Sequence, residues 1–188
     1  NIENCVAEVA ASLCAARKRG EILDEQKLQT ALEKFSGVKR RFEFYVNTPR
    51  QVYMDDYAHH PTEITATLTA AKNLSYNNVI AVFQPFTFSR TALLKDEFIK
   101  ALSIADKVIL TPIMGSREVN SWGISSEDIA KELPDAVIVD GFENIANKII
   151  ETAKENDIVI TMGGGDIYKA AYIVKEKFAY DTEEINEG

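Results

Sequence analysis

Val79-Ile80-Ala81-Val82-Phe83 is a run of five apolar residues, and its pattern decides the class of fold. It lacks the alternation of polar and apolar residues that marks a strand with one face in water. Residues 107–110, 136–139 and 157–161 are similar, mainly apolar runs, and helical patterns separate them. Strands of this kind belong to a parallel sheet covered by helices on both faces. The sequence therefore predicts a doubly wound α/β domain with a mostly parallel, Rossmann-like sheet.

Two alternating segments precede these strands. Residues 41–46 and 51–55 are joined by Asn47-Thr48-Pro49-Arg50, which predicts a β-hairpin at the start of the domain. Pro61 is placed to begin a helix after the hairpin, and residues 90–102 have the pattern of another helix.

The first part of the chain has a different pattern. Residues 2–19 and 25–35 have the apolar spacing of two helices, and Ser36-Gly37 breaks the pattern. We therefore expect residues 1–37 to be the final helices of a preceding domain and residues 38–188 to be the α/β domain. Because the helical pattern begins almost at Asn1, without a methionine, we also expect the chain to be a piece of a longer protein.

Composition narrows the class of protein. The 188 residues carry a net charge of −8, which argues against nucleic acid or an anionic membrane as the main partner. Cys5 and Cys14 would lie about 13 Å apart on one helix, too far for a disulfide. Free thiols, no recognisable leader and no apolar run of about 18 residues predict a cytoplasmic protein.

Three loops deserve a functional interpretation because they follow strands of the predicted sheet. They are residues 55–61, 84–91 and 163–166. In doubly wound sheets, ligands bind beyond the carboxyl ends of the strands. The sequence therefore predicts that these loops share one site.

The first loop, Asp55-Asp56-Tyr57-Ala58-His59-His60-Pro61-Thr62-Glu63, contains both histidines of the chain. In a functional interpretation, Asp56 accepts a hydrogen bond from a ribose hydroxyl, while Tyr57 and His59 face a substrate. In a structural interpretation, Asp56 caps a turn and the histidines bind backbone carbonyls. A metal site is a third possibility, but adjacent residues rarely converge on one ion.

The second loop places Ser89 and Arg90 at a predicted helix start, which suits a carboxylate or phosphate. The alternative is that Ser89 caps the helix and Arg90 is solvated. In the third loop, Gly163-Gly164-Gly165-Asp166 is neither a dinucleotide fingerprint nor a P-loop, and tight packing is the favoured interpretation. Lys39-Arg40-Arg41 would ordinarily be solvated, although an arginine at a domain junction can reach a nucleotide.

With these residues in view, the chain resembles the C-terminal part of the Mur ligases along nearly its whole length. Within that family it is most similar to the members that join L-alanine to UDP-N-acetylmuramate. The first loop is the most specific part of the resemblance. The matching stretches are Gly37-Val38-Lys39-Arg40-Arg41-Phe42-Glu43, residues 55–63, Val82-Phe83-Gln84-Pro85 with Ser89-Arg90-Thr91, and Gly164-Gly165-Asp166.

The resemblance implies roles for individual residues. Asn1 and Asn4 would lie near the adenine of ATP, while Arg41 and Asp56 would hold ATP across a domain cleft. Tyr57, His59 and Arg90 would approach the incoming L-alanine, with Arg90 at its carboxylate. Many relatives have His-Arg where this chain has Phe86-Thr87, which leaves more of that contact to Arg90.

The implied activity is ATP-dependent amide ligation in peptidoglycan precursor synthesis, through an acyl phosphate. The substrates would be UDP-N-acetylmuramate, L-alanine and ATP with Mg²⁺. No P-loop occurs in this sequence, so the phosphates and Mg²⁺ would be bound mainly by the absent central domain, and the piece alone would be inactive. The resemblance implies no catalytic or metal-binding residue in this piece. Two alternatives stay open: a free-standing metal-dependent hydrolase using Asp55, Asp56, His59 and His60, and a non-catalytic nucleotide-binding module.

Overall fold

The structure is a computed structural model that describes residues 2–22, 24–34, 39–48 and 51–186, with side chains for 6–22, 24–34, 39–48 and 51–178. Its contacts divide the chain into two compact units, Asn1–Gly37 and Val38–Gly188. Among the described residues, no helix combines the length and apolar character that a membrane span requires.

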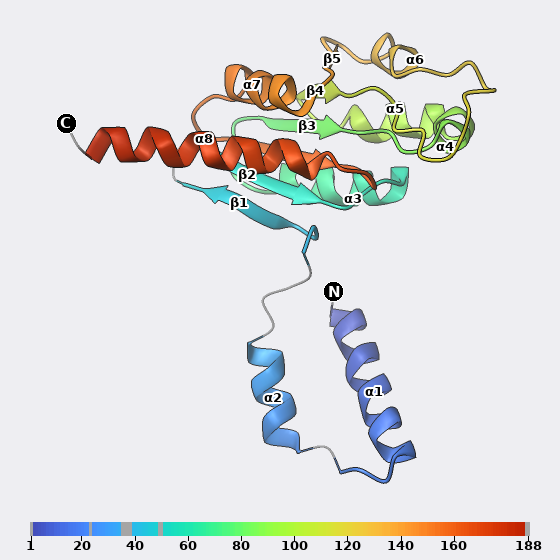
Figure 1. The fold of residues 1–188 in the computed structure, drawn as a ribbon, viewed down its shortest axis with the longest axis vertical. Coiled ribbons are helices and arrows are strands. Elements are labelled where there is room, and N and C mark those ends of the chain that lie inside the picture. The colour runs from blue at the N-terminus through green and yellow to red at the C-terminus, as the bar shows by residue number, and fades with distance from the viewer. Residues whose placement is uncertain (1, 23, 35–38, 49–50, 187–188) are drawn as a thin grey trace. The chain divides into compact units, whose positions relative to one another are not determined.

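The first unit consists of two helices, α1 (Ile2–Lys18) and α2 (Glu25–Glu33) (Figure 1). The Asp24 carboxylate caps α2 by accepting hydrogen bonds from the amides of Gln26 and Lys27 at 3.0 and 3.2 Å. Several apolar side chains of these helices are exposed to solvent, among them Val6 and Leu13. α2 has no buried residue of its own. The structure confirms both predicted helices, α1 and α2.

The second unit is built on a six-stranded sheet with the order β1-β2-β6-β3-β4-β5. β1 and β2 form the predicted antiparallel hairpin, and every other neighbouring pair is parallel. The predicted α/β class and Rossmann-like sheet are confirmed. The strands are β1 (Glu43–Asn47), β2 (Gln51–Asp56), β3 (Val79–Phe83), β4 (Lys107–Leu110), β5 (Val137–Ile138) and β6 (Asp157–Met162).

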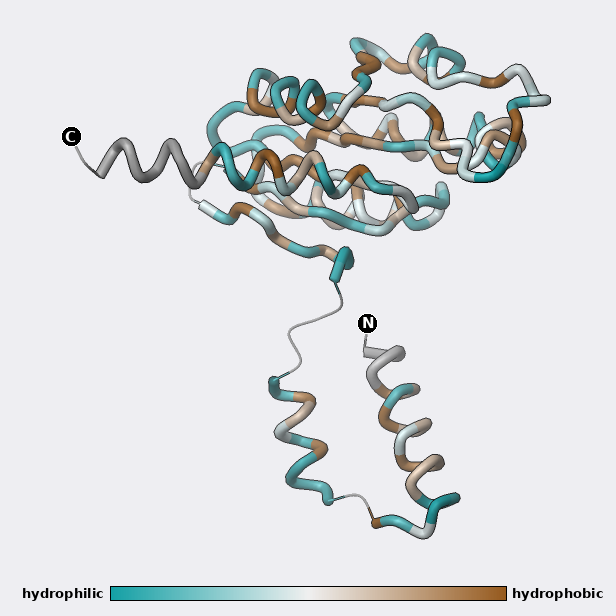
Figure 2. The backbone as a smooth tube through the Cα atoms, viewed as in Figure 1, coloured by the Kyte–Doolittle hydropathy of each residue, from teal (hydrophilic) through white to brown (hydrophobic). Residues whose placement is uncertain are grey.

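Helices cover both faces of this sheet because side chains along each central strand alternate between two cores. In β3, Val79, Ala81 and Phe83 pack into one core with α3, α5 and α6. Ile80 and Val82 of the same strand pack into the other with α7 and α8. Figure 2 shows α7 alternating between brown and teal along its length, the colouring of a helix with one buried side. The helices are α3 (Pro61–Lys72), α4 (Phe88–Leu93), α5 (Lys95–Leu102), α6 (Glu127–Ala130), α7 (Phe142–Thr152) and α8 (Tyr168–Asn186).

One helix of the prediction is divided in the structure. Residues 90–102 were expected to be continuous, but the backbone leaves the helical region at Leu94, which has φ −114° and ψ 22°. Leu94 packs against the core shared by α3 and α5. The break therefore separates the short α4, which carries Arg90, from the core helix α5.

Candidate functional site

The three loops expected to share a site follow β2, β3 and β6 at one edge of the sheet. β6 pairs with both β2 and β3, so the loops are neighbours, as predicted. β2 and β3 lead to helices on one face, whereas β6 leads to α8 on the other face. Ligands of doubly wound sheets bind where neighbouring strands send their connections to opposite faces. The topology thus marks this edge as the candidate site.

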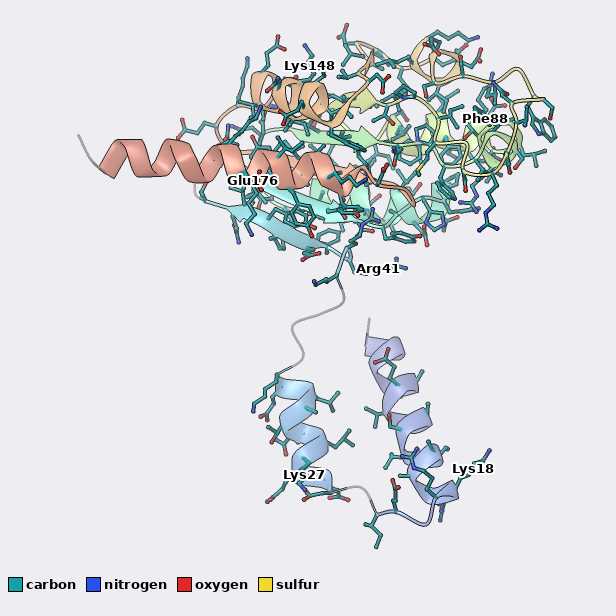
Figure 3. All side chains as sticks on the ribbon, in the orientation of Figure 1. Lys18, Lys27, Arg41, Phe88, Lys148 and Glu176 are labelled. Atoms are coloured by element: carbon teal, nitrogen blue, oxygen red, sulfur yellow. The ribbon has the colours of Figure 1, made fainter. Side chains whose placement is uncertain are left out.

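Arg41 lies in a bend of the chain just before β1 (Figure 3). Its neighbours Arg40 and Phe42 have φ values of 58° and 52°, a left-handed conformation that is uncommon outside glycine. Two hydrogen bonds hold the bend: the Arg40 amide donates to the Glu43 carboxylate, and the Tyr57 amide donates to the Arg40 carbonyl, each at 2.7 Å. Arg41 is exposed, and its guanidinium carbon lies 5.8 Å from the centre of the Tyr57 ring. Strained backbone of this kind clusters at functional sites.

Asp56 ends β2 and is only 6% exposed. Its Oδ1 accepts a hydrogen bond from the Ala58 amide at 2.9 Å, and its Oδ2 accepts one from the Phe42 amide at 3.1 Å. Burial raises the pKa of Asp56, while these two hydrogen bonds and the charge of Arg41 oppose the rise. Asp56 therefore closes a turn, as in the structural interpretation. Its contact with ribose stays a prediction.

Asp55 is fully buried and pairs with Arg40, whose Nε lies 2.9 Å from Oδ2. The Thr161 hydroxyl donates to the other oxygen, Oδ1, at 2.6 Å. Burial raises the pKa of Asp55, and the hydrogen bonds from Thr161 and Arg40 oppose the rise. The expectation of a solvated basic cluster is therefore wrong for Arg40, because its side chain is only 18% exposed and neutralises a carboxylate inside the fold.

The loop after β2 is fixed by its own side chains. The Glu63 carboxylate accepts hydrogen bonds from the amides of His59 and His60 at 2.9 and 3.2 Å, and Nδ1 of His60 accepts one from the Thr62 amide at 3.4 Å. Burial opposes ionisation of Glu63, but the amide hydrogen bonds outweigh it and hold its pKa below the usual range. His60 is thus the N-cap of α3. The His59 ring lies against Tyr57, with ring centres 5.1 Å apart and Nδ1 2.9 Å from the Tyr57 carbonyl oxygen.

The glycine-rich turn, residues 163–167, forms hydrogen bonds with protein side chains through both its amides and its carbonyls. Its last two amides donate to Oε1 of Gln84 at 3.0 and 3.2 Å. Its carbonyls at Gly163 and Gly165 accept hydrogen bonds from Arg40 at 2.8 and 2.9 Å. A phosphate cradle needs free amides, and two of this turn's amides are already used. The turn is a tightly packed connector, as the favoured interpretation predicted.

Arg90 has a different environment in α4. Its Nη1 is buried and has no hydrogen-bond partner. The expected anion position at the start of α4 is taken by Glu118, whose carboxylate accepts from the Ser89 amide at 2.8 Å and from the Ser89 hydroxyl at 2.6 Å. Capping by Ser89 is therefore wrong, whereas the role of Arg90 at a carboxylate stays a prediction. The N-cap is Thr87, which makes no side-chain capping bond, and Arg90 is not simply solvated.

The chain before Arg90 is held in a strained conformation. Thr87 has φ 65° and ψ 140°, which side-chain-bearing residues rarely adopt. Its amide donates to the Met114 carbonyl at 2.9 Å, and the Met114 amide donates to the Pro85 carbonyl at 2.9 Å. The Phe88 ring fills the space beside Gly115, where any Cβ would collide with it. These contacts with the loop after β4 fix the position from which Arg90 extends.

A hollow of about 240 Å³ lies at the same edge of the sheet, near the ends of β3, β4 and β5. Gln84, Thr111 and Asp140 contribute polar groups to its wall, and Phe142 and Ile145 contribute apolar ones. Of the predicted site residues whose side chains the structure describes, none lines this hollow. Gln84, however, begins the second loop of the predicted site, so the hollow adjoins that loop.

The arrangement of acidic and histidine side chains does not favour a metal centre. Within the described part of the chain, no group of three or more His, Cys, Asp or Glu residues is placed to hold a metal ion. Asp55 is paired with Arg40, and His60 caps α3. The four ligands of the hydrolase alternative are thus engaged separately.

The structure brings four of the seven predicted site residues together. Arg41, Asp56, Tyr57 and His59 gather around the end of β2, whereas Arg90 follows β3. Asn1 and the side chain of Asn4 lie outside the described residues.

Three important residues of this edge were not singled out as site residues from the sequence. Arg40 and Gln84 fix the glycine-rich turn, and Glu118 fixes the start of α4. Their partners are separated from them by 29 to 125 positions in the chain, so local patterns contain no signal for them. The feature that marks Arg40 is the pair of left-handed backbone angles at Arg40 and Phe42. These residue types do not predict such angles, so the sequence contains no signal for it.

Comparisons with known proteins show which family the chain resembles. The profile of a family described as "Mur ligase, glutamate ligase domain" matches residues 40–165. The chain is 43% identical over 159 residues to UDP-N-acetylmuramate–L-alanine ligase of Caldicellulosiruptor saccharolyticus, covering 82% of this chain and 35% of that protein. It is 42% identical over 173 residues to the ligase of the same name from Lachnospira eligens, covering 90% of this chain and 36% of that protein.

A solved structure has the same fold. UDP-N-acetylmuramate–alanine ligase from Thermotoga maritima superposes with a TM-score of 0.64 at 27% identity, covering 90% of this chain and 36% of that chain. The present chain thus spans about a third of the length of the relatives it matches.

Proposed function

The chain belongs to the Mur ligase family, and from that premise we propose that it is the C-terminal part of a UDP-N-acetylmuramate–L-alanine ligase. The reaction would join L-alanine to UDP-N-acetylmuramate at the expense of ATP, in peptidoglycan precursor synthesis. In the geometry, the observation that carries this proposal is the buried, partnerless Nη1 of Arg90. A buried guanidinium nitrogen without a partner is costly, and a carboxylate is the group that best satisfies it.

The two units would have different origins in the whole enzyme. In the proposal, residues 1–37 are the last helices of the central ATP-binding domain, and residues 38–188 are the domain that binds the amino acid. The exposed Val6 and Leu13 of the first unit support this, since exposed apolar side chains on a helix are suited to packing against further protein. The remaining domains would supply the P-loop.

ATP would be held partly by residues of this chain. Arg41 is exposed and forms no ion pair with a described residue, so its charge is available to a phosphate group. Asp56, which already binds the Phe42 amide, would also accept a hydrogen bond from the ribose. Asn1 and Asn4 would lie near the adenine. Mg²⁺ would neutralise phosphate charge, and because the described residues contain no metal-binding group of acids and histidines, its ligands would come from elsewhere in the enzyme.

The chemistry would proceed in two steps. The muramoyl carboxylate attacks the γ-phosphorus of ATP, which gives an acyl phosphate and releases ADP. The nitrogen of L-alanine then attacks the carbonyl carbon, the bond from that carbon to the phosphate oxygen breaks, and a proton leaves the nitrogen. Arg90 would hold the alanine carboxylate, with Tyr57 and His59 close to the amino acid. The domain would thus contribute by positioning the nucleophile, in a reaction that we assign to the cytoplasm.

The test uses the intact ligase that contains this sequence. We expect ADP release that requires both UDP-N-acetylmuramate and L-alanine, and Arg41→Ala or Asp56→Ala should raise the KM for ATP or lower kcat at least tenfold, by loss of a charged contact worth about 1.5–3 kcal/mol. A matched control is Lys39→Ala, which removes an exposed charge from the same cluster. Wild-type kinetics in both site variants would contradict the assigned roles. Tight ATP binding by the 188-residue chain alone would instead favour a nucleotide-binding module, and stoichiometric metal in the loop after β2 would favour the hydrolase.

A further inference from the structure

Arg40 uses its entire guanidinium within the fold. Nε lies 2.9 Å from Oδ2 of Asp55, Nη1 donates to the Gly165 carbonyl at 2.9 Å, and Nη2 donates to the Gly163 carbonyl at 2.8 Å. One side chain therefore joins the end of β2 to the turn that follows β6.

Two aromatic rings enclose the same guanidinium. Its central carbon lies 4.8 Å from the ring centre of Tyr57 and 4.6 Å from that of Tyr168, the first residue of α8. Such contacts are attractive and favour arginine, whose flat group can stack and donate hydrogen bonds at the same time. The position of Arg40 is thus fixed by its hydrogen bonds and also by its contacts with the two rings.

This fixed side chain belongs to the bend that presents Arg41. Arg40 and Phe42 both have left-handed backbone angles, so the chain reverses on either side of Arg41. Non-glycine residues keep such angles only where their surroundings impose them. Here the surroundings are the guanidinium contacts of Arg40, the hydrogen bond from the Tyr57 amide to its carbonyl, and the hydrogen bond from the Phe42 amide to Asp56.

We propose that Arg40 is a positioning residue for the nucleotide: by anchoring the bend, it aims Arg41 at the phosphate groups, and Arg41 lies near the Tyr57 ring but forms no ion pair with a described residue. This inference rests on the proposed function, because it assigns Arg40 to the ATP contact of Arg41. The adjacent arginines have opposite tasks, one inside the fold and one at its surface. The bend also carries the amide that binds Asp56, so both predicted ATP contacts depend on the same anchor.

Lysine separates positioning from charge. Arg40→Lys keeps a cation beside Asp55 but cannot reach two carbonyls and stack between two rings together. We expect the intact ligase with Arg40→Lys to show a KM for ATP raised about tenfold, since a misplaced contact group weakens binding and catalysis. A purely structural role would reduce the folded fraction, and so lower kcat per total protein without changing the KM for ATP.

A second readout does not depend on activity. In the 188-residue chain with Arg40→Lys, the amides of Phe42 and Tyr57 should exchange with solvent at least tenfold faster, because the bend that protects them is loosened. Lys39→Ala, an exposed change in the same cluster, should alter neither amide exchange nor the KM for ATP.

The outcomes distinguish the two proposals. If Arg41→Ala raises the KM for ATP and Arg40→Lys does not, Arg40 is not a positioning residue, while the proposed function stands. If Arg41→Ala has no effect, the assigned ATP contact fails, and the inference fails with it. If Arg40→Lys does not fold, Tyr168→Leu tests the inference in its place. This change removes one ring beside the guanidinium and leaves the three hydrogen bonds of Arg40. It should raise the KM for ATP two- to threefold. An unchanged KM in Tyr168→Leu would then overturn the inference.

Discussion

Arg40 and Arg90 lie at the same edge of the sheet, but their guanidinium groups have opposite environments. Around Arg40, at the ends of β2 and β6, three guanidinium nitrogens have protein partners. Around Arg90, after β3, one guanidinium nitrogen is buried without any partner. Buried polar groups are almost always hydrogen-bonded, so a satisfied group belongs to the scaffold and an unsatisfied one is a candidate contact for water, an ion or a ligand. The comparison separates a part of the site that supports the fold from a part that we propose binds a ligand.

The largest expected effect tests the supporting role of Arg40. Arg40→Ala leaves the fully buried Asp55 carboxylate without its cation, which should lower the free energy of unfolding by about 3 kcal/mol. Urea denaturation of the 188-residue chain measures this. Arg41→Ala is the matched control and should change stability by less than about 0.5 kcal/mol, since it is exposed. Equal losses in the two variants would remove the distinction between the neighbouring arginines.

The glycine-rich turn offers the next largest effect. A Cβ at Gly165 would overlap Oε1 of Gln84 and the sulfur of Met114, so Gly165→Ala should cost about 1–3 kcal/mol of stability. At Gly164, a Cβ would lie 3.3 Å from the His59 ring, which a small movement can accommodate. Thermal unfolding should therefore rank Gly164→Ala between wild type and Gly165→Ala. The reverse order would show that Gln84 does not hold the turn closely.

A smaller effect should appear in the pH dependence of the loop after β2. Burial opposes ionisation of Glu63, but hydrogen bonds from the amides of His59 and His60 lower its pKa below the ordinary value of 4.5. A lowered pKa means that its contribution is complete above pH 4.5 and is lost as the pH falls through the folded-state pKa. Because Glu63 is partly exposed, Glu63→Gln should cost only about 0.5 kcal/mol at neutral pH. In denaturation at several pH values, the difference between wild type and variant should shrink below pH 4.5, and a constant difference would contradict the assignment.

The smallest expected effect on stability belongs to Arg90. Because its buried Nη1 has no partner, Arg90→Ala removes a desolvated donor along with its packing, and stability should change by no more than about 0.5 kcal/mol. The same urea denaturation measures it beside Arg40→Ala. A loss above about 2 kcal/mol would mean that Arg90 is scaffolding after all.

The sequence predicted the fold well because the central strands are mainly apolar and helical patterns separate them. It predicted the meeting of three loops for a general reason, since the carboxyl ends of parallel strands share one edge. Apart from the family resemblance, it did not distinguish Arg40 from Arg41, because their difference arises from a left-handed bend formed by ordinary residues. It did not anticipate that Ser89 at the start of α4 binds Glu118, which lies 29 positions away. Local sequence patterns thus predict the helices, the strands and the edge of the sheet where loops meet. They do not predict which side chain pairs with each charged residue, because these partners are distant in the sequence.

We propose that the buried Nη1 of Arg90, which has no partner among the described residues, binds the carboxylate of the incoming amino acid. The most direct measurement is the KM for L-alanine in the intact ligase with Arg90→Ala. Loss of a charge-assisted contact worth about 1.5–3 kcal/mol should raise this KM roughly 10- to 150-fold, with the KM for ATP unchanged. An unchanged KM for L-alanine in a folded variant would contradict the claim.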